Sequence, residues 1–137
     1  MEDSGKMKEL YIQDALEYTE RVINTMHDPL IILYEDFKVA LANRFFYQIF
    51  EVKPEDTEGQ FIYDLGNRQW DIPKLRQLLE DILPKTTSFD NFEIEHTFPL
   101  IGLRRMLLNA CRIYMEANRT KLIIISMKDI TERKKPD

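Results

Sequence analysis

The sequence predicts a single α+β domain in which an antiparallel sheet carries helices on one face. Three observations support this fold class. An amphipathic helical pattern opens the chain, two short strand-like runs follow it, and three longer strand-like runs close it after several helical segments. Strands joined by short turns pair antiparallel, and helices gathered between them cover one face of such a sheet. The length of 137 residues fits one domain, and 44% hydrophobic with 31% charged residues is typical of a folded chain.

Charge and cysteine content exclude several classes of function. The net charge is −5 at pH 7, whereas nucleic-acid binding relies on clustered Lys and Arg that displace counterions from phosphates. Cys111 is the only cysteine, so neither a disulfide framework nor a cysteine-rich metal site is expected. The apolar runs are shorter than the roughly 18–20 residues that cross a bilayer, and no signal-peptide segment precedes them. We therefore expect a cytoplasmic chain with no nucleic-acid partner, no metal and no direct membrane insertion.

An amphipathic helix is predicted at the N-terminus. Apolar residues recur at helical spacing between residues 10 and 26, and Asp28-Pro29 ends the pattern because proline cannot donate the next backbone hydrogen bond. The broad apolar face fits contact either with the rest of the chain or with a second copy. We assign residues 1–27 to this helix and expect it to form a cap or to support a homodimer. Its expected contact residues are Ile12, Leu16, Ile23 and Met26.

Two strands and a helix are expected next. Leu30–Tyr34 is an apolar run typical of a buried strand, and Lys38–Ala42 follows it after the acidic turn at Glu35-Asp36. Asn43 then stands where a helix N-cap is expected, because its side-chain oxygen can accept a hydrogen bond from an unpaired amide of the first turn. The helix after it has a bulky apolar side, formed by Phe45, Phe46, Ile49 and Phe50.

A longer helix is predicted after a stretch of short helical or loop segments between residues 53 and 66. Asp71 is the expected N-cap, and Pro73 is well placed in the first turn, where its missing amide hydrogen is not needed. Pro84 is expected to end the helix. Its apolar positions repeat at helical spacing and comprise Leu75, Leu78, Leu79 and Ile82.

Three strands are predicted in the last third of the chain. In Phe89–Phe98 every second residue is apolar or aromatic, so Phe92, Ile94, His96 and Phe98 should share the buried face. The next two strands, 105–116 and 121–129, are apolar on consecutive residues, which indicates that both of their faces are covered. We expect the N-terminal helix or a second copy of the chain to cover the outer face.

Three motifs together resemble the PAS sensor domains of signalling proteins. Met26–Ile32 is similar to the PAS entry strand, Ala42–Phe46 to the "A-N-x-x-F" start of the first helix, and Asp129–Arg133 to the terminal "D-I-T-E-R" signature. The resemblance covers about residues 18–134. Tyr63–Asn67, with the segments around it and in the later strands, resembles a subgroup attached to sensor histidine kinases and chemotaxis-type signalling proteins.

The resemblance implies a five-stranded antiparallel PAS domain over residues 28–130, followed by the start of an output helix over 131–137. The carboxylate of Asp129 can accept hydrogen bonds from the amides of the next turn, and Glu132 can reach back as in a capping box. Signal output is therefore assigned to Asp129, Ile130, Thr131 and Glu132. The alternative is a frayed C-terminus with no signalling role.

PAS folds commonly hold a pocket between the sheet and the helices, and five residues are candidates to line it here: Asn43, Trp70, His96, Asn109 and Cys111. An inward His96 could bind haem iron or a proton, although a structural, hydrogen-bonded histidine is the more common case. The resemblance disfavours haem, because haem-binding relatives place the ligand on the longer helix, which lacks histidine here. It also disfavours covalent flavin, because Gly66–Gln69 lacks the cysteine of the flavin motif. The identity of a small ligand stays open.

No set of residues with the spacing of a catalytic site is present in the sequence. We therefore expect a non-enzymatic module that senses a signal, dimerises and relays the signal to an effector domain in cis, with a histidine kinase as the expected parent. Two alternatives remain: a pure protein-interaction module with a filled core, and a small α+β enzyme that binds a ligand in its cavity. The stimulus and the effector cannot be derived from these residues.

Overall fold

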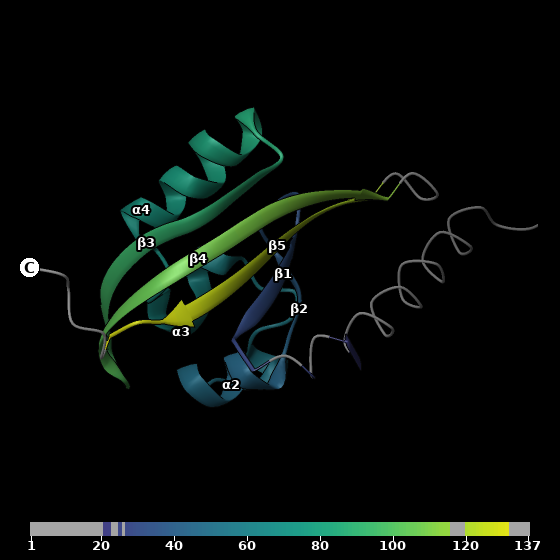
Figure 1. Cartoon of the computed structure of the whole chain (residues 1–137). Coiled ribbons are helices and arrows are strands. Elements are labelled where there is room, and N and C mark those ends of the chain that lie inside the picture. Colours follow the sequence, from purple (N-terminus) through teal and green to yellow (C-terminus); the bar gives the residue numbers. More distant parts are fainter. Residues whose placement is uncertain (1–20, 23–24, 26, 116–119, 132–137) are drawn as a thin grey trace, which may run out of the picture.

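The computed structural model describes residues 21–22, 25, 27–115 and 120–131. Its centre is a five-stranded antiparallel sheet with the strand order β2-β1-β5-β4-β3 (Figure 1). The first and last strands of the sequence therefore lie side by side in the middle of the sheet. The strands are β1 (Leu30–Tyr34), β2 (Val39–Ala42), β3 (Ser88–Phe98), β4 (Gly102–Met115) and β5 (Thr120–Asp129).

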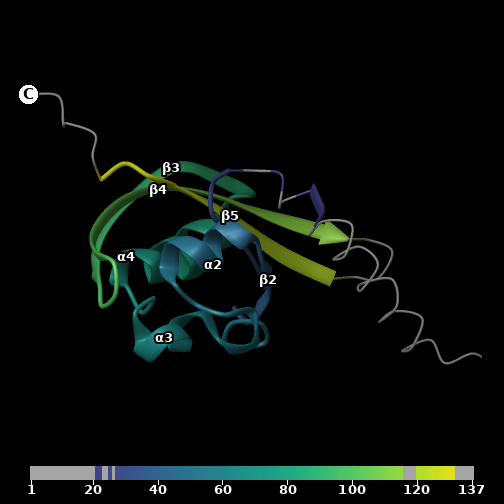
Figure 2. The same ribbon diagram turned by 90° about the horizontal axis from the view of Figure 1, so that it is seen from below.

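The helical segments between β2 and β3 all lie on one side of this sheet (Figure 2). We call the sheet face that they cover the inner face and the opposite one the outer face. The longest helical stretch begins as α4 at Pro73, widens into a π-helix and tightens into a final 3-10 turn. In chain order the segments are α2 (Arg44–Phe50), η1 (Pro54–Asp56), η2 (Ile62–Asp64), α3 (Leu65–Arg68), α4 (Pro73–Arg76), η3 (Gln77–Ile82) and η4 (Leu83–Lys85).

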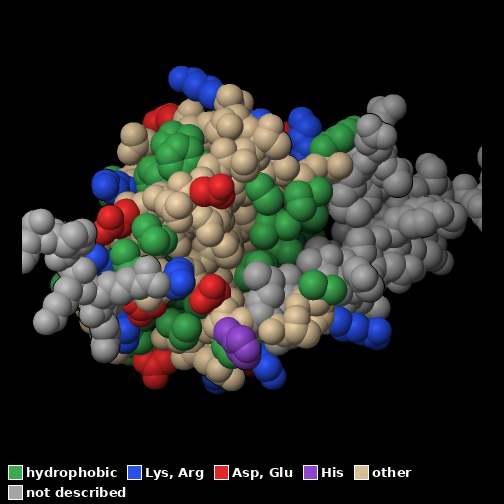
Figure 3. All heavy atoms as spheres, viewed as in Figure 1, with side chains coloured by type: hydrophobic (Ala, Val, Ile, Leu, Met, Phe, Trp, Pro, Cys, Tyr) green, Lys and Arg blue, Asp and Glu red, His purple; other side chains and the backbone are tan. Residues whose placement is uncertain are grey.

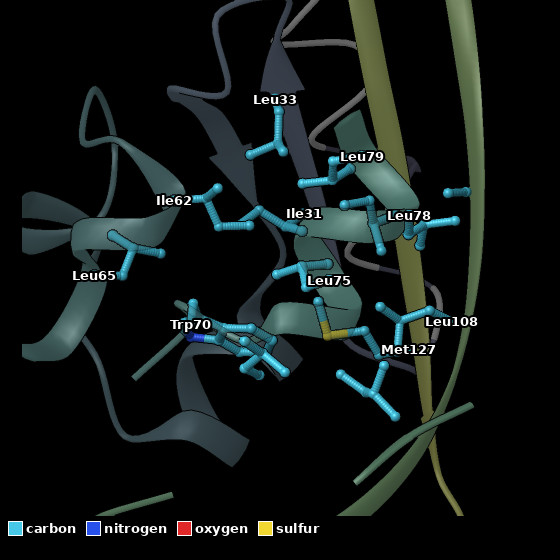
Figure 4. Close-up of a cluster of buried hydrophobic side chains, with 14 of the residues drawn as sticks. Ile31, Leu33, Ile62, Leu65, Trp70, Leu75, Leu78, Leu79, Leu108 and Met127 are labelled. Carbon is cyan, nitrogen blue, oxygen red and sulfur yellow. The ribbon is translucent and has the colours of Figure 1, made fainter. Parts of the chain in front are cut away.

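The main hydrophobic core lies between the inner face and the helices. Leu75, Leu78 and Leu79 of the long helical stretch point toward Leu108 and Met127 of the sheet (Figure 4). All five side chains are buried, and burial of an aliphatic side chain of this size stabilises the fold by roughly 1.5–3 kcal/mol. This core fixes the position of the helices on the sheet.

A second, smaller cluster lies on the outer face. The paired residues Ile32 and Ile124 belong to it, whereas their neighbours in sequence, Ile31 and Ile125, belong to the main core. Hydrophobic side chains gather on this face over β1 and β5 (Figure 3). The expectation that consecutive apolar residues in β5 serve both faces is confirmed for these positions. The buried members of the cluster are Leu30, Ile32, Leu41 and Leu122.

Most elements expected from the sequence are present. The α+β class, the five antiparallel strands and the bounds of β1 are confirmed, while β4 begins three residues earlier than expected. The prediction that Asp71 caps the long helix is wrong, because Ile72 occupies the N-cap position without a side-chain hydrogen bond. The predicted N-terminal helix, with all four of its contact residues, lies outside the described residues apart from positions 21–22, 25 and 27.

Candidate functional site

Asn43 is the most heavily bonded of the five pocket candidates that the sequence suggested. Its Oδ1 accepts hydrogen bonds from the backbone amides of Phe46 and Leu30, each at 3.0 Å, and its Nδ2 donates to the carbonyl of Asp28 at 2.9 Å. The predicted N-cap of α2 is confirmed. The side-chain amide also joins the start of β1 to this helix, and the residue is fully buried. Its polar atoms therefore stabilise the fold.

Trp70 lies in the interior, at the centre of an aromatic cluster. Its ring is stacked against Phe46 at 5.7 Å between centroids and meets Phe50 at 4.7 Å and Phe98 at 5.1 Å. Aromatic pairs at such distances add to the stabilisation from burial alone. Its indole Nε1 is buried without a hydrogen-bond partner among the described residues. These four rings fill the space between the inner face and α2.

His96 lies at the edge of this interior. Its ring meets Phe98 edge-on at 4.9 Å, and in the sheet it pairs with Arg104 of β4. The side chain is half-buried, so the alternation of β3 placed it on the correct face but not in the centre of the core. Its neighbours are therefore one aromatic ring of the core and one strand residue that carries a positive charge.

Asn109 and Cys111 lie on the outer face of β4, whereas Trp70 is buried in the main core, and their role in lining a ligand pocket stays a prediction. Their strand partners are Ser126 and Ile124, and Ile124 packs in the outer cluster. The Oδ1 of Asn109 accepts a hydrogen bond at 2.8 Å from the amide of Asn91, a residue with φ of 57° where β3 bulges. Two neighbouring strands with apolar residues on both sides gave no alternation from which their facing could be predicted.

The surroundings of Cys111 favour the protonated thiol over the thiolate. Partial burial, followed by the nearby Asp90 carboxylate, raises its pKa above the ordinary value of 9.0. The nucleophilic form of cysteine is the thiolate, and a reactive cysteine needs a positively charged surrounding. The structure thus agrees with a role for Cys111 in packing.

The C-terminal end of β5 carries a polar network centred on Asp129. One carboxylate oxygen, Oδ2, pairs with Nη1 of Arg104 at 3.0 Å, and the other, Oδ1, accepts hydrogen bonds from both the amide and the hydroxyl of Thr131. The Thr131 hydroxyl oxygen also accepts a bond from the amide of Arg105 at 2.9 Å. The last residue of β5 and Thr131, two residues beyond it, are thereby attached to β4.

A backbone hydrogen bond and a buried side chain add to this network. We call the end of β5 with Ile130 and Thr131 the junction. The amide of Ile130 donates to the carbonyl of Arg105 at 2.8 Å, and the Ile130 side chain is buried. Burial acts to raise the pKa of Asp129, but the hydrogen bonds from Thr131 and the nearby Arg104 outweigh it and lower the pKa. Glu132, the fourth residue assigned to signal output, lies outside the described residues.

A second charged cluster, which the sequence did not indicate, surrounds Asp71. Arg76 and Arg68 donate to its two oxygens at 2.6 and 2.8 Å, and these bonds lower the pKa of Asp71 to about 2. The guanidinium of Arg76 also lies 4.0 Å above the ring of Tyr63. Burial, then the charge of Glu80, raises the pKa of Tyr63 well above its ordinary value. In the sequence Asp71 was predicted only as a helix cap, and no ion pair was expected for it.

Neither a metal-binding group nor a membrane-spanning helix is found in the part of the chain that the structure describes. Among residues 27–115 and 120–131, with positions 21–22 and 25, no three His, Cys, Asp or Glu side chains are grouped as a metal ion would require. In the same part of the chain, none of the helices has the length and apolar character needed to cross a membrane.

Comparisons with known proteins identify the class to which this fold belongs. The family model described as the PAS fold matches residues 17–130. The chain therefore belongs to the PAS family. A search of curated proteins found no match.

Solved structures show the same fold at low sequence identity. The PAS domain of BvgS from Bordetella pertussis has a TM-score of 0.64 and 18% identity, over 87% of this chain and 88% of that one. A PAS domain from a two-component sensor histidine kinase has a TM-score of 0.63 and 8% identity, over 85% and 97%. VqmA of Vibrio cholerae, described as a dimer in the absence of target DNA, has a TM-score of 0.70 and 12% identity, over 89% of this chain but 54% of its own.

Proposed function

We propose that this PAS domain senses a signal, dimerises and relays the signal to an effector domain in cis, as part of a cytoplasmic sensor histidine kinase. The observation that carries the proposal is the network around Asp129, which attaches the exit of the last strand to β4 through Arg104 and Thr131. The fold shared with a PAS domain of a two-component sensor histidine kinase supports the choice of effector.

The relay would run across three neighbouring strands. Trp70 packs on Phe98 of β3, Phe98 contacts His96, His96 is paired with Arg104 of β4, and Arg104 binds Asp129 of β5. A change in interior packing would shift the ends of these strands and alter the geometry of the ion pair. Packed interiors respond to such shifts by switching between discrete arrangements, so the residues after Asp129 would leave the domain in one of two directions.

The dimerisation part of the proposal rests on the predicted N-terminal helix rather than on free outer-face surface, because the outer cluster is already buried in the single chain. The cluster of Leu30, Ile32, Leu41 and Leu122 is apolar, and apolar sheet faces of this kind pack against a helix or another sheet. The predicted contacts of Ile12, Leu16, Ile23 and Met26 with a second copy stay a prediction. In a dimer, output helices of two copies would lie close together, which is what a change of register between them requires.

The junction is tested in the protein joined to its effector. Asp129→Ala and Arg104→Gln each remove one side of the same ion pair, so each should change the basal output of the effector by at least about fivefold, the lower end of typical coupling between sites. The double variant should add little to either single one, because both changes break one interaction. Effector autophosphorylation, or the corresponding activity of another effector, is the measurement.

Asp81→Ala is the matched control, since Asp81 is an exposed carboxylate of η3 outside the Asp129 network. It should leave the output unchanged. Circular dichroism of each variant checks that the domain remains folded. Unaltered output in both junction variants would contradict the relay through Asp129.

A second candidate function, a pure interaction module, is favoured by the aromatic cluster. Phe46, Phe50, Trp70 and Phe98 fill the interior, and a filled interior needs no ligand for stability. Native mass spectrometry separates the two candidates: a small molecule that is retained with the purified protein supports sensing, and an empty protein that binds a partner domain supports interaction.

A further inference from the structure

The two edges of the sheet end differently. At the β2 edge, the amide of Val39 donates to the carbonyl of Gln60, and the carbonyl of Val39 accepts from the amide of Gly59, each at 2.8 Å. The chain thus closes this edge with its own backbone. At the other edge lies β3, and among the described residues no hydrogen bond joins the backbone of residues 92–98 to any segment except β4. Unpaired groups on an edge strand are a template for pairing with another chain.

The strand register identifies which backbone groups of β3 face outward. The amide and the carbonyl of Arg105 both bond to residues 130–131, so both groups point toward the exit of β5. In an antiparallel ladder, the residue opposite Arg105 on the far side then turns its own amide and carbonyl away from β4. That residue is Glu95. Glu93 and Thr97 have the same orientation, because a strand repeats every two residues.

This part of β3 is regular and accessible. Its ladder with β4 continues without a register shift from Phe92 to Phe98, and the stretch contains no proline. The side chains of Glu93, Glu95 and Thr97 are exposed. The helices lie on the inner side of the sheet rather than in line with β3 (Figure 2). A further strand could therefore extend the sheet at this edge without displacing the helices.

Charge on the outer face limits the kind of strand that fits. Arg105 lies 3.5 Å from Glu93, and within the described chain no ion pair is found for Glu95. The two carboxylates therefore share one guanidinium, which leaves an excess of negative charge beside the open edge. Opposite charges on directly opposed residues of two strands stabilise the pair, and like charges destabilise it. A strand with Lys or Arg opposite these glutamates is favoured.

The same charges oppose pairing between two copies of β3. In a symmetric antiparallel pair that overlaps residues 92–98 completely, Glu95 would lie opposite the same residue of the second copy, and Glu93 opposite Thr97. Each copy would bring two carboxylates and only the guanidinium of Arg105 to the shared outer face. The edge is therefore better suited to a different, basic chain than to a second copy.

We propose that the edge of β3 binds an extended, basic segment of a partner protein as a sixth, antiparallel strand, with Lys or Arg at every second residue opposite Glu93 and Glu95. Main-chain hydrogen bonds supply the affinity of such strand addition, and alternate side chains supply its specificity. This interaction surface goes beyond the proposed sensing and relay. It lies on the opposite side of β4 from the Asp129 network, so either proposal can fail without the other.

The probe is a short peptide of alternating lysine and valine with blocked termini, and its control has glutamate in place of lysine. Added to the ¹⁵N-labelled chain of 137 residues, the lysine peptide should shift the amide resonances of Glu93, Glu95 and Thr97 and slow their hydrogen exchange. The amides of Ile94 and His96, which face β4, should change less. The glutamate peptide should bind at least about fivefold more weakly.

Methylation of the peptide backbone distinguishes strand pairing from attraction between charges. In the proposed register, the amides of the lysines point toward β3 and those of the valines point away. N-methylation of the lysine amides should therefore abolish binding. N-methylation of the valine amides should leave the affinity within about twofold, because these amides make no bond to β3.

Variants of the protein separate charge from backbone pairing. Glu95→Lys should weaken binding of the lysine peptide by at least about fivefold and strengthen that of the glutamate peptide. Glu55→Lys, the same change at an exposed position of η1, should do neither. Thr97→Pro leaves the charges unchanged and removes an outward amide, which an edge strand tolerates; it should weaken the lysine peptide about fivefold. Circular dichroism checks the fold of each variant.

Several outcomes would overturn the proposal. They are no binding of the lysine peptide up to the order of 10 mM, equal binding of the two peptides, shifts confined to residues outside β3, and binding that survives methylation of the lysine amides. Analytical ultracentrifugation of the protein alone gives one more. A dimer in which the amides of Glu93, Glu95 and Thr97 become protected would show that the edge pairs with a second copy instead.

Discussion

The two faces of the sheet differ in their side-chain composition and in the segments that they contact. The inner face meets helices of its own chain, and aromatic rings close the space between them. The outer face has two parts. Around Ile32 and Ile124 it is apolar, and near the N-terminal end of β4 it has an ion pair between Arg105 and Glu93 at 3.5 Å. Adjacent residues of one strand therefore pack in two separate hydrophobic clusters, one on each face of the sheet.

The largest effect is expected when a side chain on the inner or the outer face of β5 is shortened, because this compares the packing of the two faces directly. Ile125→Ala should reduce the free energy of unfolding by about 2–5 kcal/mol, because Ile125 is fully buried in the main core. Ile124→Ala, one residue away but only partly buried on the outer face, should cost less than half as much. Urea unfolding of both variants is the measurement. Equal losses would show that the outer face is packed as tightly as the inner one.

A smaller loss of stability is expected when either of two asparagines that bond to backbone amides, Asn43 and Asn109, is replaced by alanine. Asn43→Ala should destabilise by about 2 kcal/mol, since it removes the cap of α2 and leaves the buried amide of Leu30 without its acceptor. Asn109→Ala should cost about half of this, because the amide of Asn91 is exposed and water can replace its partner. Thermal unfolding monitored by circular dichroism separates them. A larger loss for Asn109 would mean that the bulge of β3 contributes more to stability than the helix cap.

The smallest effect concerns the reactivity of Cys111 on the outer face. Because burial and Asp90 raise the pKa of its thiol above 9.0, the group is protonated at neutral pH, and its alkylation rate should keep rising as the pH passes 9. Asp90→Asn removes one cause of the shift, so the rate at a given pH should increase by about two- to threefold. Iodoacetamide labelling followed by mass spectrometry measures both rates. A rate that levels off below pH 8 would contradict the raised pKa.

Alternation along a strand predicted the facing of side chains only where the strand has one apolar side. In β3 the apolar residues alternate, and His96 and Phe98 lie on the expected face. In β4 and β5 the apolar residues are consecutive, so the same reasoning could not tell that Asn109 faces outward and Ala110 inward. The choice of face there depends on the register with a neighbouring strand, which local sequence does not specify.

Interactions across the sheet and between segments were likewise beyond prediction from the sequence. Asp129 was expected to bond with the turn after it, and it does so through Thr131, but its ion pair joins it to Arg104, 25 residues away. Asp71 was expected to cap a helix and instead binds Arg68 and Arg76. The carboxylate of an aspartate can accept a hydrogen bond either from a backbone amide or from a guanidinium. Which donor it meets is decided only when the segments pack.

The amino-acid sequence alone determined the elements of this protein: the bounds of β1, the cap at Asn43 and the polar turn that begins at Asp129. Each depends on hydrogen bonds and side-chain preferences within a few residues. Only the tertiary structure decided which residues share a face, which charges meet, and that β3 lies at the edge of the sheet. These features arise where segments far apart in sequence come into contact, and their geometry follows from strand register and packing rather than from any local pattern.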